Sequence, residues 1–187
     1  MRFSAVLTRL DLPVAELSAL RLDGEAFALD EAVIAVDEPE LAENRALALA
    51  GVLDERMTAE LDTALWVYGC LDGPPRVHTA SIGKIARGRL LSTTRVSLRE
   101  TTVPDDELVQ LGGIRVTGRA RTLVDVALLE SVSTTRVVAA QLLCRSPDVV
   151  PAALTIAVHL GRTPGKLRAL ERIREWAASA ALSATRR

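Results

Sequence analysis

Hydrophobic and polar positions alternate with two different periods over the first 40 residues. From Pro13 to Leu22 the apolar residues recur at helical spacing, and this pattern stops at the turn-forming pair Asp23-Gly24. Two short apolar runs follow at residues 26–29 and 32–36, separated only by Asp30-Glu31. Two such runs joined by a tight polar turn predict a β-hairpin. The chain therefore begins with a helix followed by a two-stranded ribbon.

Two further helices are predicted before a clear break in the chain. Residues 40–53 have a helical pattern interrupted near Gly51, and residues 58–68 have a second one with Thr58 as candidate N-cap. The Asp-Gly-Pro-Pro sequence at 72–75 then stops any regular element. We expect two domains: a degenerate winged-helix-like unit with its linking helices in residues 1–69, and an α+β domain in residues 70–187.

The second domain changes from a strand-like to a helix-like pattern near Gly118. Residues 76–118 contain three segments in which Val, Ile or Leu alternates with Arg or Thr, as in half-buried strands. The predicted fold class is α+β, with a winged-helix-like N-terminal unit, a short β-sheet and C-terminal helices. An apolar stripe on the last helix predicts core packing, with a dimer seam as the alternative. The four predicted C-terminal helices cover residues 121–130, 134–144, 149–160 and 166–182.

Composition fits a globular protein, since 49% of the 187 residues are hydrophobic. No apolar run reaches the roughly 18–20 residues that a membrane helix needs. The first residues contain charges where a signal peptide would need an apolar stretch. We therefore expect a cytoplasmic protein that makes no contact with a membrane.

The formal net charge of −1 is the sum of two unlike halves. Residues 1–60 hold five arginines against thirteen acidic residues, a net charge of −8. Residues 61–187 hold 18 basic residues against 11 acidic ones, a net charge of +7. Such asymmetry predicts either two modules with different partners or two halves that attract each other.

The segment from Arg76 to Arg99 is the strongest candidate for binding, because it carries six cations and no acidic residue. Alternation along a strand would place Arg95 and Arg99 on one face. Such a surface suits the phosphates of double-stranded DNA or an acidic protein. The alternative is a solvated sheet face whose charges pair with the acidic N-terminal half. The candidate DNA- or partner-binding residues are Arg76, Lys84, Arg87, Arg89, Arg95, Arg99, Arg115 and Arg119.

Residues that could perform catalysis or hold a metal are sparse. The two cysteines and two histidines lie far apart, whereas a zinc site needs about four clustered ligands. No nucleophile motif and no phosphate-cradling glycine loop is present in the sequence. We therefore expect no metal, no cofactor and no enzymatic activity, with His78 and His159 in structural roles. The acidic run at 105–107 is expected to be a solvated turn.

The sequence from Gly112 to Glu130 predicts a strand-to-helix junction. Arg121 and Asp125 lie four positions apart on the helix, where an ion pair between them would fix the junction. Thr117 or Thr122 is a candidate cap for this helix.

This order of features resembles the AbiEi family of antitoxins, which belong to type IV toxin–antitoxin systems that cause abortive infection. The resemblance covers roughly residues 5–130. The residues that carry it are Ala64, Trp66, Gly69, Gly113, Val116, Thr117, Arg121, Thr122 and Asp125. It implies an N-terminal winged helix–turn–helix, a C-terminal antitoxin domain and repression of the protein's own operon in bacteria.

The sequence departs from that family in its N-terminal unit, where Arg21 is the single cation between residues 12 and 40. A strongly acidic element would repel phosphate, so contact with operator DNA would fall to the arginines of residues 76–121. We expect an antitoxin-like transcriptional regulator that binds operator DNA, counteracts a nucleotidyltransferase toxin, or both. The alternative is a protein–protein interaction module with a decayed DNA-binding domain.

Overall fold

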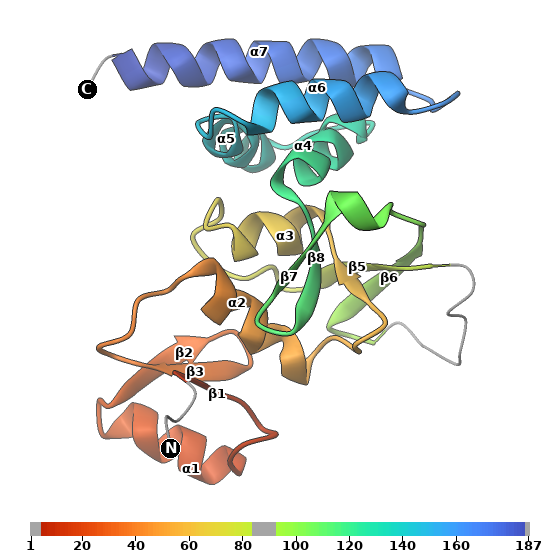
Figure 1. Ribbon diagram of the computed structural model, residues 1–187. Coiled ribbons are helices and arrows are strands. Elements are labelled where there is room, and N and C mark those ends of the chain that lie inside the picture. Colours follow the sequence, from red (N-terminus) through yellow and green to blue (C-terminus); the bar gives the residue numbers. More distant parts are fainter. Residues whose placement is uncertain (1–4, 84–92, 186–187) are drawn as a thin grey trace.

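The computed structural model describes residues 5–83 and 93–185, which form seven α-helices and two β-sheets (Figure 1). The α+β class is therefore confirmed. The elements lie in three tiers: the first sheet with α1, the second sheet with α2 and α3, and the helices α4 to α7 (Figure 1). No helix of the described chain is long and apolar enough to cross a membrane.

The first sheet is built from the helix and hairpin predicted at the start of the chain, together with one extra strand. Its strands are antiparallel in the order β1-β3-β2, and α1 packs on one face through Leu17, Ala26 and Val33. We call these residues, 5–35, the acidic unit. The elements are β1 (Val6–Leu7), α1 (Val14–Leu22), β2 (Ala26–Leu29) and β3 (Ala32–Ala35).

The second sheet has five strands in the order β6-β5-β4-β8-β7, where the sequence predicted three. Its central strand β4 is parallel to β8 and antiparallel to β5. The edge strand β6 is parallel to β5, and β7 and β8 form an antiparallel hairpin. The elements are β4 (Thr58–Ala59), β5 (His78–Ile82), β6 (Val96–Glu100), β7 (Leu108–Leu111) and β8 (Ile114–Thr117).

The prediction that Thr58 caps a helix over residues 58–68 is wrong. Thr58 lies in strand β4, between Ser81 on one side and Arg115 on the other, and helix α3 begins only at Leu61. Pairing on both sides satisfies the backbone of Thr58, so tertiary structure overrides the local helical pattern. The chain turns from strand to helix at Leu61, whose φ of 48° is positive.

The remaining predicted helices are present with small changes in their limits. The helix predicted over residues 40–53 is α2, continued by one 3₁₀ turn at Leu49–Gly51. The stripe on α7 lies in the core at Ile173 and Trp176, whereas Leu167 is exposed. The helices are α2 (Ala42–Ala48), α3 (Leu61–Val67), α4 (Arg119–Leu128), α5 (Thr134–Leu143), α6 (Val149–His159) and α7 (Lys166–Thr185).

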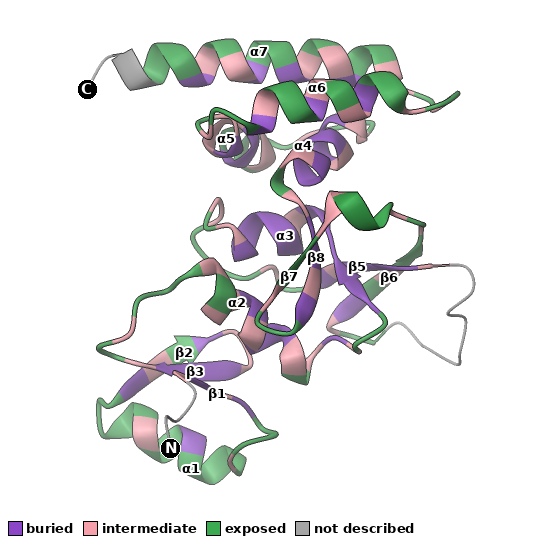
Figure 2. Ribbon diagram, viewed as in Figure 1, coloured by how far each residue is buried: buried purple, intermediate pink, exposed green. Residues whose placement is uncertain are grey.

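Helix α3 joins two hydrophobic cores and is buried along nearly its whole length (Figure 2). Its Trp66 packs in the core between the two sheets, and its Leu65 packs in the core of the four C-terminal helices. The first core includes residues on both sides of position 69, from Val6 to Val116. The three tiers are thus packed together through α3.

Basic residues of α7 hold the ends of two neighbouring helices. Arg172 donates hydrogen bonds to the carbonyls of Ala127 and Leu129, at the C-terminus of α4. Lys166 donates to the carbonyl of Leu160, at the C-terminus of α6. Cations at helix C-termini satisfy carbonyls that have no partner within the helix and complement the helix dipole.

The β7–β8 turn gives a matched test of backbone geometry. Gly112 and Gly113 both have positive φ, but a Cβ at Gly112 would lie 2.7 Å from the carbonyl oxygen of Glu43 in α2, whereas Gly113 faces open space. We expect Gly113→Ala to lower the free energy of unfolding by about 1 kcal/mol through strain alone. Gly112→Ala should lower it by about 2 kcal/mol, because α2 must also move. Urea unfolding measures both, and equal losses would contradict the close contact with α2.

Candidate functional site

The structure separates the residues predicted to bind DNA or a partner. Arg76 lies just before β5, and Arg95 and Arg99 lie at the start of β6 and within it. Arg115 is in β8, where its guanidinium donates to the carbonyl of Glu55, and Arg119 is the first residue of α4. Lys84, Arg87 and Arg89 lie outside the described residues.

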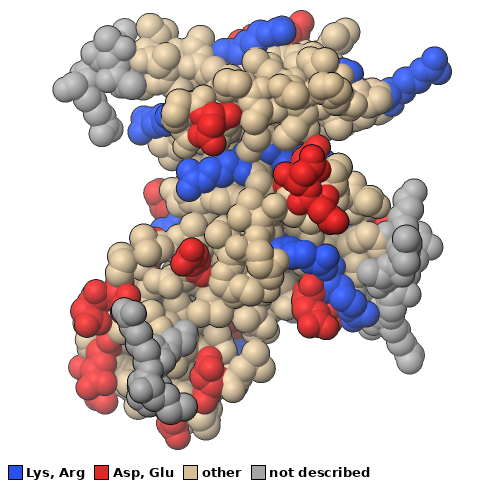
Figure 3. All heavy atoms as spheres, in the orientation of Figure 1, with Lys and Arg blue, Asp and Glu red and all other residues tan. Residues whose placement is uncertain are grey.

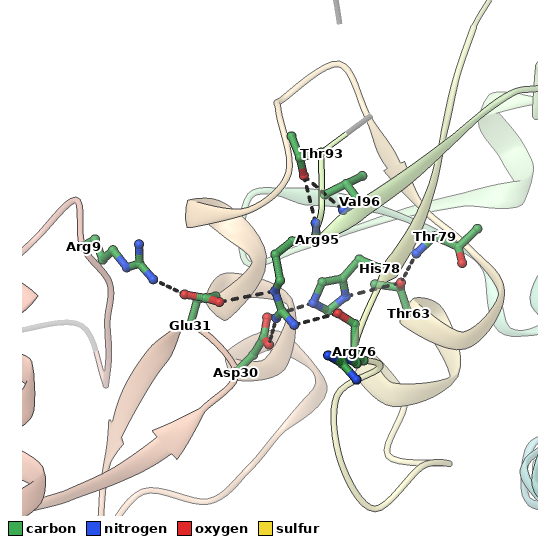
Figure 4. A network of polar contacts seen from close by, with 10 residues as sticks. All are labelled: Arg9, Asp30, Glu31, Thr63, Arg76, His78, Thr79, Thr93, Arg95 and Val96. Atoms are coloured by element: carbon green, nitrogen blue, oxygen red, sulfur yellow. Dashed lines mark hydrogen bonds and ion pairs between the residues drawn. The ribbon is translucent and has the colours of Figure 1, made fainter. Parts of the chain in front are cut away.

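The Arg95 side chain contacts carboxylates of the acidic unit (Figure 4). Its guanidinium forms ion pairs with Asp30 and Glu31 at the turn between β2 and β3. It also donates to the carbonyl of Arg76 at 2.8 Å, and Arg9 pairs with the same Glu31. Arg95 therefore pairs with the acidic N-terminal half, which was the alternative to a phosphate-binding role for the basic segment.

Asp30 is the central residue of this contact. It lies at the tip of the hairpin with φ of 55°, a conformation that aspartate tolerates better than most residues. Its side chain is only 3% exposed, and its Oδ2 lies 2.9 Å from Nε2 of His78. Burial opposes ionisation of Asp30, but His78 and Arg95 outweigh it and lower the pKa of this carboxyl. We call Arg9, Asp30, Glu31, Thr63, His78 and Arg95 the turn network.

His78 has partners that its isolated position in the sequence did not reveal. Its Nδ1 lies 3.4 Å from Oγ1 of Thr63, and that hydroxyl accepts the Thr79 N–H at 2.8 Å. Asp30, His78 and Thr63 thus follow the order of a carboxylate–imidazole–hydroxyl triad. His78 and Thr63 are both fully buried, so the hydroxyl cannot reach a substrate in this conformation. The network joins the two sheets and gives no argument for catalysis.

Arg99 contacts a different carboxylate. Its Nη1 lies 3.3 Å from Oε1 of Glu60, the residue that precedes α3, and its side chain is about half exposed. Glu60 itself is buried, and its Oε1 has no hydrogen-bond partner among the described residues. Arg99 therefore combines an internal ion pair with an exposed position on an edge strand.

The junction predicted around Arg121 contains the expected ion pair and one further acid. Arg121 Nε donates to Asp125 at 2.9 Å, and Arg121 Nη1 donates to Glu107 at 2.6 Å. Glu107 is thus not the solvated turn residue that was expected. The predicted threonine caps are also wrong, because Thr122 donates its hydroxyl back to the carbonyls of Thr117 and Gly118. We call Glu60, Arg99, Glu107, Arg121 and Asp125 the junction cluster.

Two carboxylates of the junction cluster are held in surroundings that disfavour their charge. Burial raises the pKa of Glu60, with Arg99 acting in the opposite direction and Asp125 reinforcing the increase. Burial likewise raises the pKa of Asp125, although Arg121 opposes this change. Asp125 Oδ2 has no hydrogen-bond partner in the structure. Both groups therefore bind a proton more readily in the folded chain than in the unfolded one.

Glu60→Gln tests this assignment. Because the folded pKa is raised above its ordinary value of 4.5, the cost of ionised Glu60 is present at neutral pH and disappears as pH falls toward that value. At pH 7 we expect the variant to equal or exceed the natural chain in free energy of unfolding, by up to about 1 kcal/mol. That advantage should be smaller at pH 5, because protonation of Glu60 in the folded chain relieves part of the cost. Urea unfolding of both chains at pH 7 and pH 5 measures this difference, with exposed Glu43→Gln as control. If Glu60→Gln instead lowers the free energy of unfolding equally at both pH values, the ionised pair with Arg99 stabilises the fold.

A surface hollow lies where α4 and α6 meet the β7–β8 hairpin. It has a volume of about 420 Å³ and is lined mainly by apolar side chains, including Val109 and Ile156. At its edge the Arg119 guanidinium lies 5.0 Å from the centre of the Tyr68 ring, and the Tyr68 hydroxyl donates to the Thr117 carbonyl. Burial raises the pKa of Tyr68 to about 12. Arg119 thus contributes to packing at this hollow.

Cofactor and metal ligands do not gather in the part of the chain that the structure describes. No group of three or more His, Cys, Asp or Glu side chains there could hold a metal ion. The two cysteines are unpaired and half-buried, and burial raises the pKa of each thiol to about 11. Neither thiol is therefore activated as a nucleophile.

Exposed acidic side chains remain on the acidic unit and the loop that follows it. Figure 3 shows them gathered over the lower part of the molecule, around α1 and the first sheet. Glu16 and Asp23 come from α1 and its end, and Glu25, Asp37 and Glu43 come from the following segments. Within residues 5–83 and 93–185, none of these five side chains forms an ion pair. Arg95, Arg99 and Arg121 are thus paired with carboxylates, whereas these five acidic side chains are exposed and have no cationic partner among those residues.

Comparisons with known proteins give no relative from which a role could be transferred. No protein-family model matches the chain, and no curated protein is similar enough to count as a relative.

Proposed function

We propose that this chain is an antitoxin-like protein of the AbiEi type that acts without catalysis, by binding a basic protein partner through its acidic unit. The resemblance to that family suggests a nucleotidyltransferase toxin as the partner. An enzyme that binds nucleotides or nucleic acid carries a cationic surface, to which an acidic face is complementary. We therefore favour binding of a toxin over binding of DNA.

One observation carries the proposal: the hairpin turn of the acidic unit packs against the second sheet, where buried Asp30 contacts His78 and Arg95. In a winged helix that docks on DNA, this turn would be free to approach the duplex. Here its carboxylates pair with Arg95, which removes one of the arginines that DNA would need. The exposed carboxylates of the same unit would repel phosphate and attract a cationic protein.

Binding of operator DNA is the second candidate, and a specific observation favours it. Arg76 is exposed and forms no ion pair with another described residue, and the half-exposed Arg99 lies in the edge strand β6. Together with the basic residues at 84–89, these groups would contribute a salt-dependent contact with phosphates.

Co-expression with the product of a neighbouring nucleotidyltransferase-like gene tests the first candidate, with growth rescue as readout. We expect the natural chain to restore growth. The triple variant Glu16→Gln, Asp23→Asn, Glu25→Gln should rescue at least tenfold fewer colonies, because it removes exposed charge from the acidic unit and breaks no ion pair among the residues that the structure describes. The control is Glu130→Gln, Glu171→Gln, Glu175→Gln, which removes the same charge from exposed positions of the helical tier. Equal rescue by both triple variants would contradict the role of the acidic unit.

Binding to the protein's own upstream DNA across a salt series tests the second candidate. The paired exchange Arg95→Glu, Arg99→Glu is unsuitable, because Arg95 holds the hairpin turn and its loss would disturb the fold. Arg76→Glu keeps the backbone carbonyl that accepts from Arg95, and Arg87→Glu removes a second cation of the basic segment. Binding at low salt that these exchanges weaken at least tenfold would support the DNA-binding role, and its absence would remove that candidate.

A further inference from the structure

Strand β2 is an edge strand of the first sheet and, among the residues that the structure describes, pairs on one side only, with β3. Its sequence is Ala-Phe-Ala-Leu, with no charged residue and no proline. Edge strands usually carry such residues because an unprotected edge pairs with other chains. Strand β6, an edge of the second sheet, follows that rule with Arg99 and Glu100. The edge of β2 is therefore open to another extended segment.

The register shows which backbone groups face outward. Glu25 accepts a hydrogen bond from Val36, so this pair exchanges ladder bonds, and antiparallel pairs alternate along a strand. Phe27 and Leu29 then also bond inward to β3. The N–H and C=O groups of Ala26 and Ala28 consequently point away from the sheet. Each is positioned to bond to an added strand.

A groove runs beside this edge, between β2 and α1. It has a volume of about 420 Å³ and is lined by Ser18, Arg21, Leu22, Ala26, Phe27 and Ala28. Leu22 is 87% exposed, although it is a large apolar side chain. The small side chains of Ala26 and Ala28 leave room for larger apolar side chains from a partner.

Charge decides between two occupants of this edge. A second copy of the chain would bring Asp23 and Glu25 toward the like-charged turn of its partner, and two acidic units would repel each other. A segment with basic residues would instead be attracted by those carboxylates. Four of the six residues that line the groove are apolar, the others being Ser18 and Arg21, and this favours apolar residues at alternate positions of the segment, since side chains alternate across a strand.

We propose that the β2 edge binds an extended segment of a partner protein in which basic and apolar residues alternate, by adding it as a fourth strand. This inference rests on the proposed function, because it names the kind of segment that the acidic unit would bind. Backbone hydrogen bonds to Ala26 and Ala28 supply the pairing, and the groove beside α1 receives the apolar side chains.

The test uses the full chain and a capped six-residue peptide that alternates lysine and valine. We expect the peptide to shift the backbone amide resonances of Ala26 and Ala28 in NMR spectra of the labelled protein. Ala28→Lys should weaken binding at least tenfold, because Ala28 is exposed and the new charge repels the peptide. The matched control is Ala178→Lys on the exposed face of α7, which should leave binding unchanged.

A second peptide with the same side chains but N-methylated amides separates strand pairing from simple charge attraction. Equal binding of both peptides would overturn the proposal, because an N-methylated backbone cannot form the ladder. A dimer in light scattering that Ala28→Lys dissociates would also overturn it, since a second copy would then occupy the edge. If the natural chain binds the peptide but does not restore growth in the co-expression test, the proposed function is refuted and the β2 edge assignment stands.

Discussion

Asp30→Asn is expected to lower the free energy of unfolding by about 3 kcal/mol, because it removes one partner of a buried charged contact. Asparagine tolerates the positive φ at this position and keeps the size of the side chain, so backbone strain does not enter. The exchange leaves buried His78 and partly buried Arg95 without their carboxylate. Urea unfolding of the natural chain and the variant measures the loss.

Glu31→Gln is the matched control, since Glu31 lies in the same turn and pairs with Arg95 and Arg9. Its side chain is 30% exposed, ten times the fraction for Asp30, so water compensates for most of the lost interaction. We expect a loss below about 1 kcal/mol. Equal midpoints for Asp30→Asn and Glu31→Gln would show that the buried contact does not hold the hairpin.

The same carboxyl makes an acid-sensitive contribution to stability. Because the folded pKa of Asp30 lies below its ordinary value of 3.8, its contribution is present above that pH and is lost as pH falls through the folded pKa. The natural chain should therefore lose stability below about pH 4 more steeply than Asp30→Asn. Parallel pH profiles would contradict the lowered pKa.

Arg121→Ala is expected to have the largest effect, a loss of about 4 kcal/mol in the free energy of unfolding. Arg121 is the counter-charge of both Glu107 and Asp125, and all three side chains are at least four-fifths buried. Its removal leaves Glu107 and Asp125 without this counter-charge, whereas Glu60 keeps Arg99. Glu107→Gln in the Arg121→Ala background should recover part of the loss.

Arg136→Ala provides the control for this exchange. Arg136 also pairs with an aspartate through two hydrogen bonds, of 2.7 and 2.8 Å to Asp62. Its side chain is 32% exposed, so we expect a loss of about 1 kcal/mol. Urea unfolding of both variants compares the two pairs, and similar losses would show that burial does not set the strength of the Arg121 contacts.

Hydrophobic periodicity predicted the long elements of this fold well, because their positions are decided by local packing faces. The hairpin at 26–35 and all four C-terminal helices are present. Strands β1, β4 and β7 were missed. Strands β1 and β4 have two residues each, too few for a period, and each is fixed by partners distant in sequence. The backbone of β4 in particular is paired with strands 21 or more positions further along the chain.

The candidate site could be predicted less well from the sequence, since its contacts join residues far apart in the chain. Arg95 and Asp30 are 65 positions apart, and nothing local to either residue indicates the pairing. The opposite charges of the two halves did indicate that they could attract each other. The acidic pair Asp30-Glu31 at the tip of the hairpin was a further signal, because it interrupts two apolar strands.

The capping of α4 and α6 by α7 has a consequence for the order in which the protein folds. Arg172 follows Ala127 by 45 positions, so the carbonyls at the end of α4 have only water as partner until α7 has been synthesised. Ile173 and Trp176 complete the same core from the same helix. The helical tier therefore closes at a late stage of translation, and a nascent chain that stops before Lys166 exposes apolar surface to proteases.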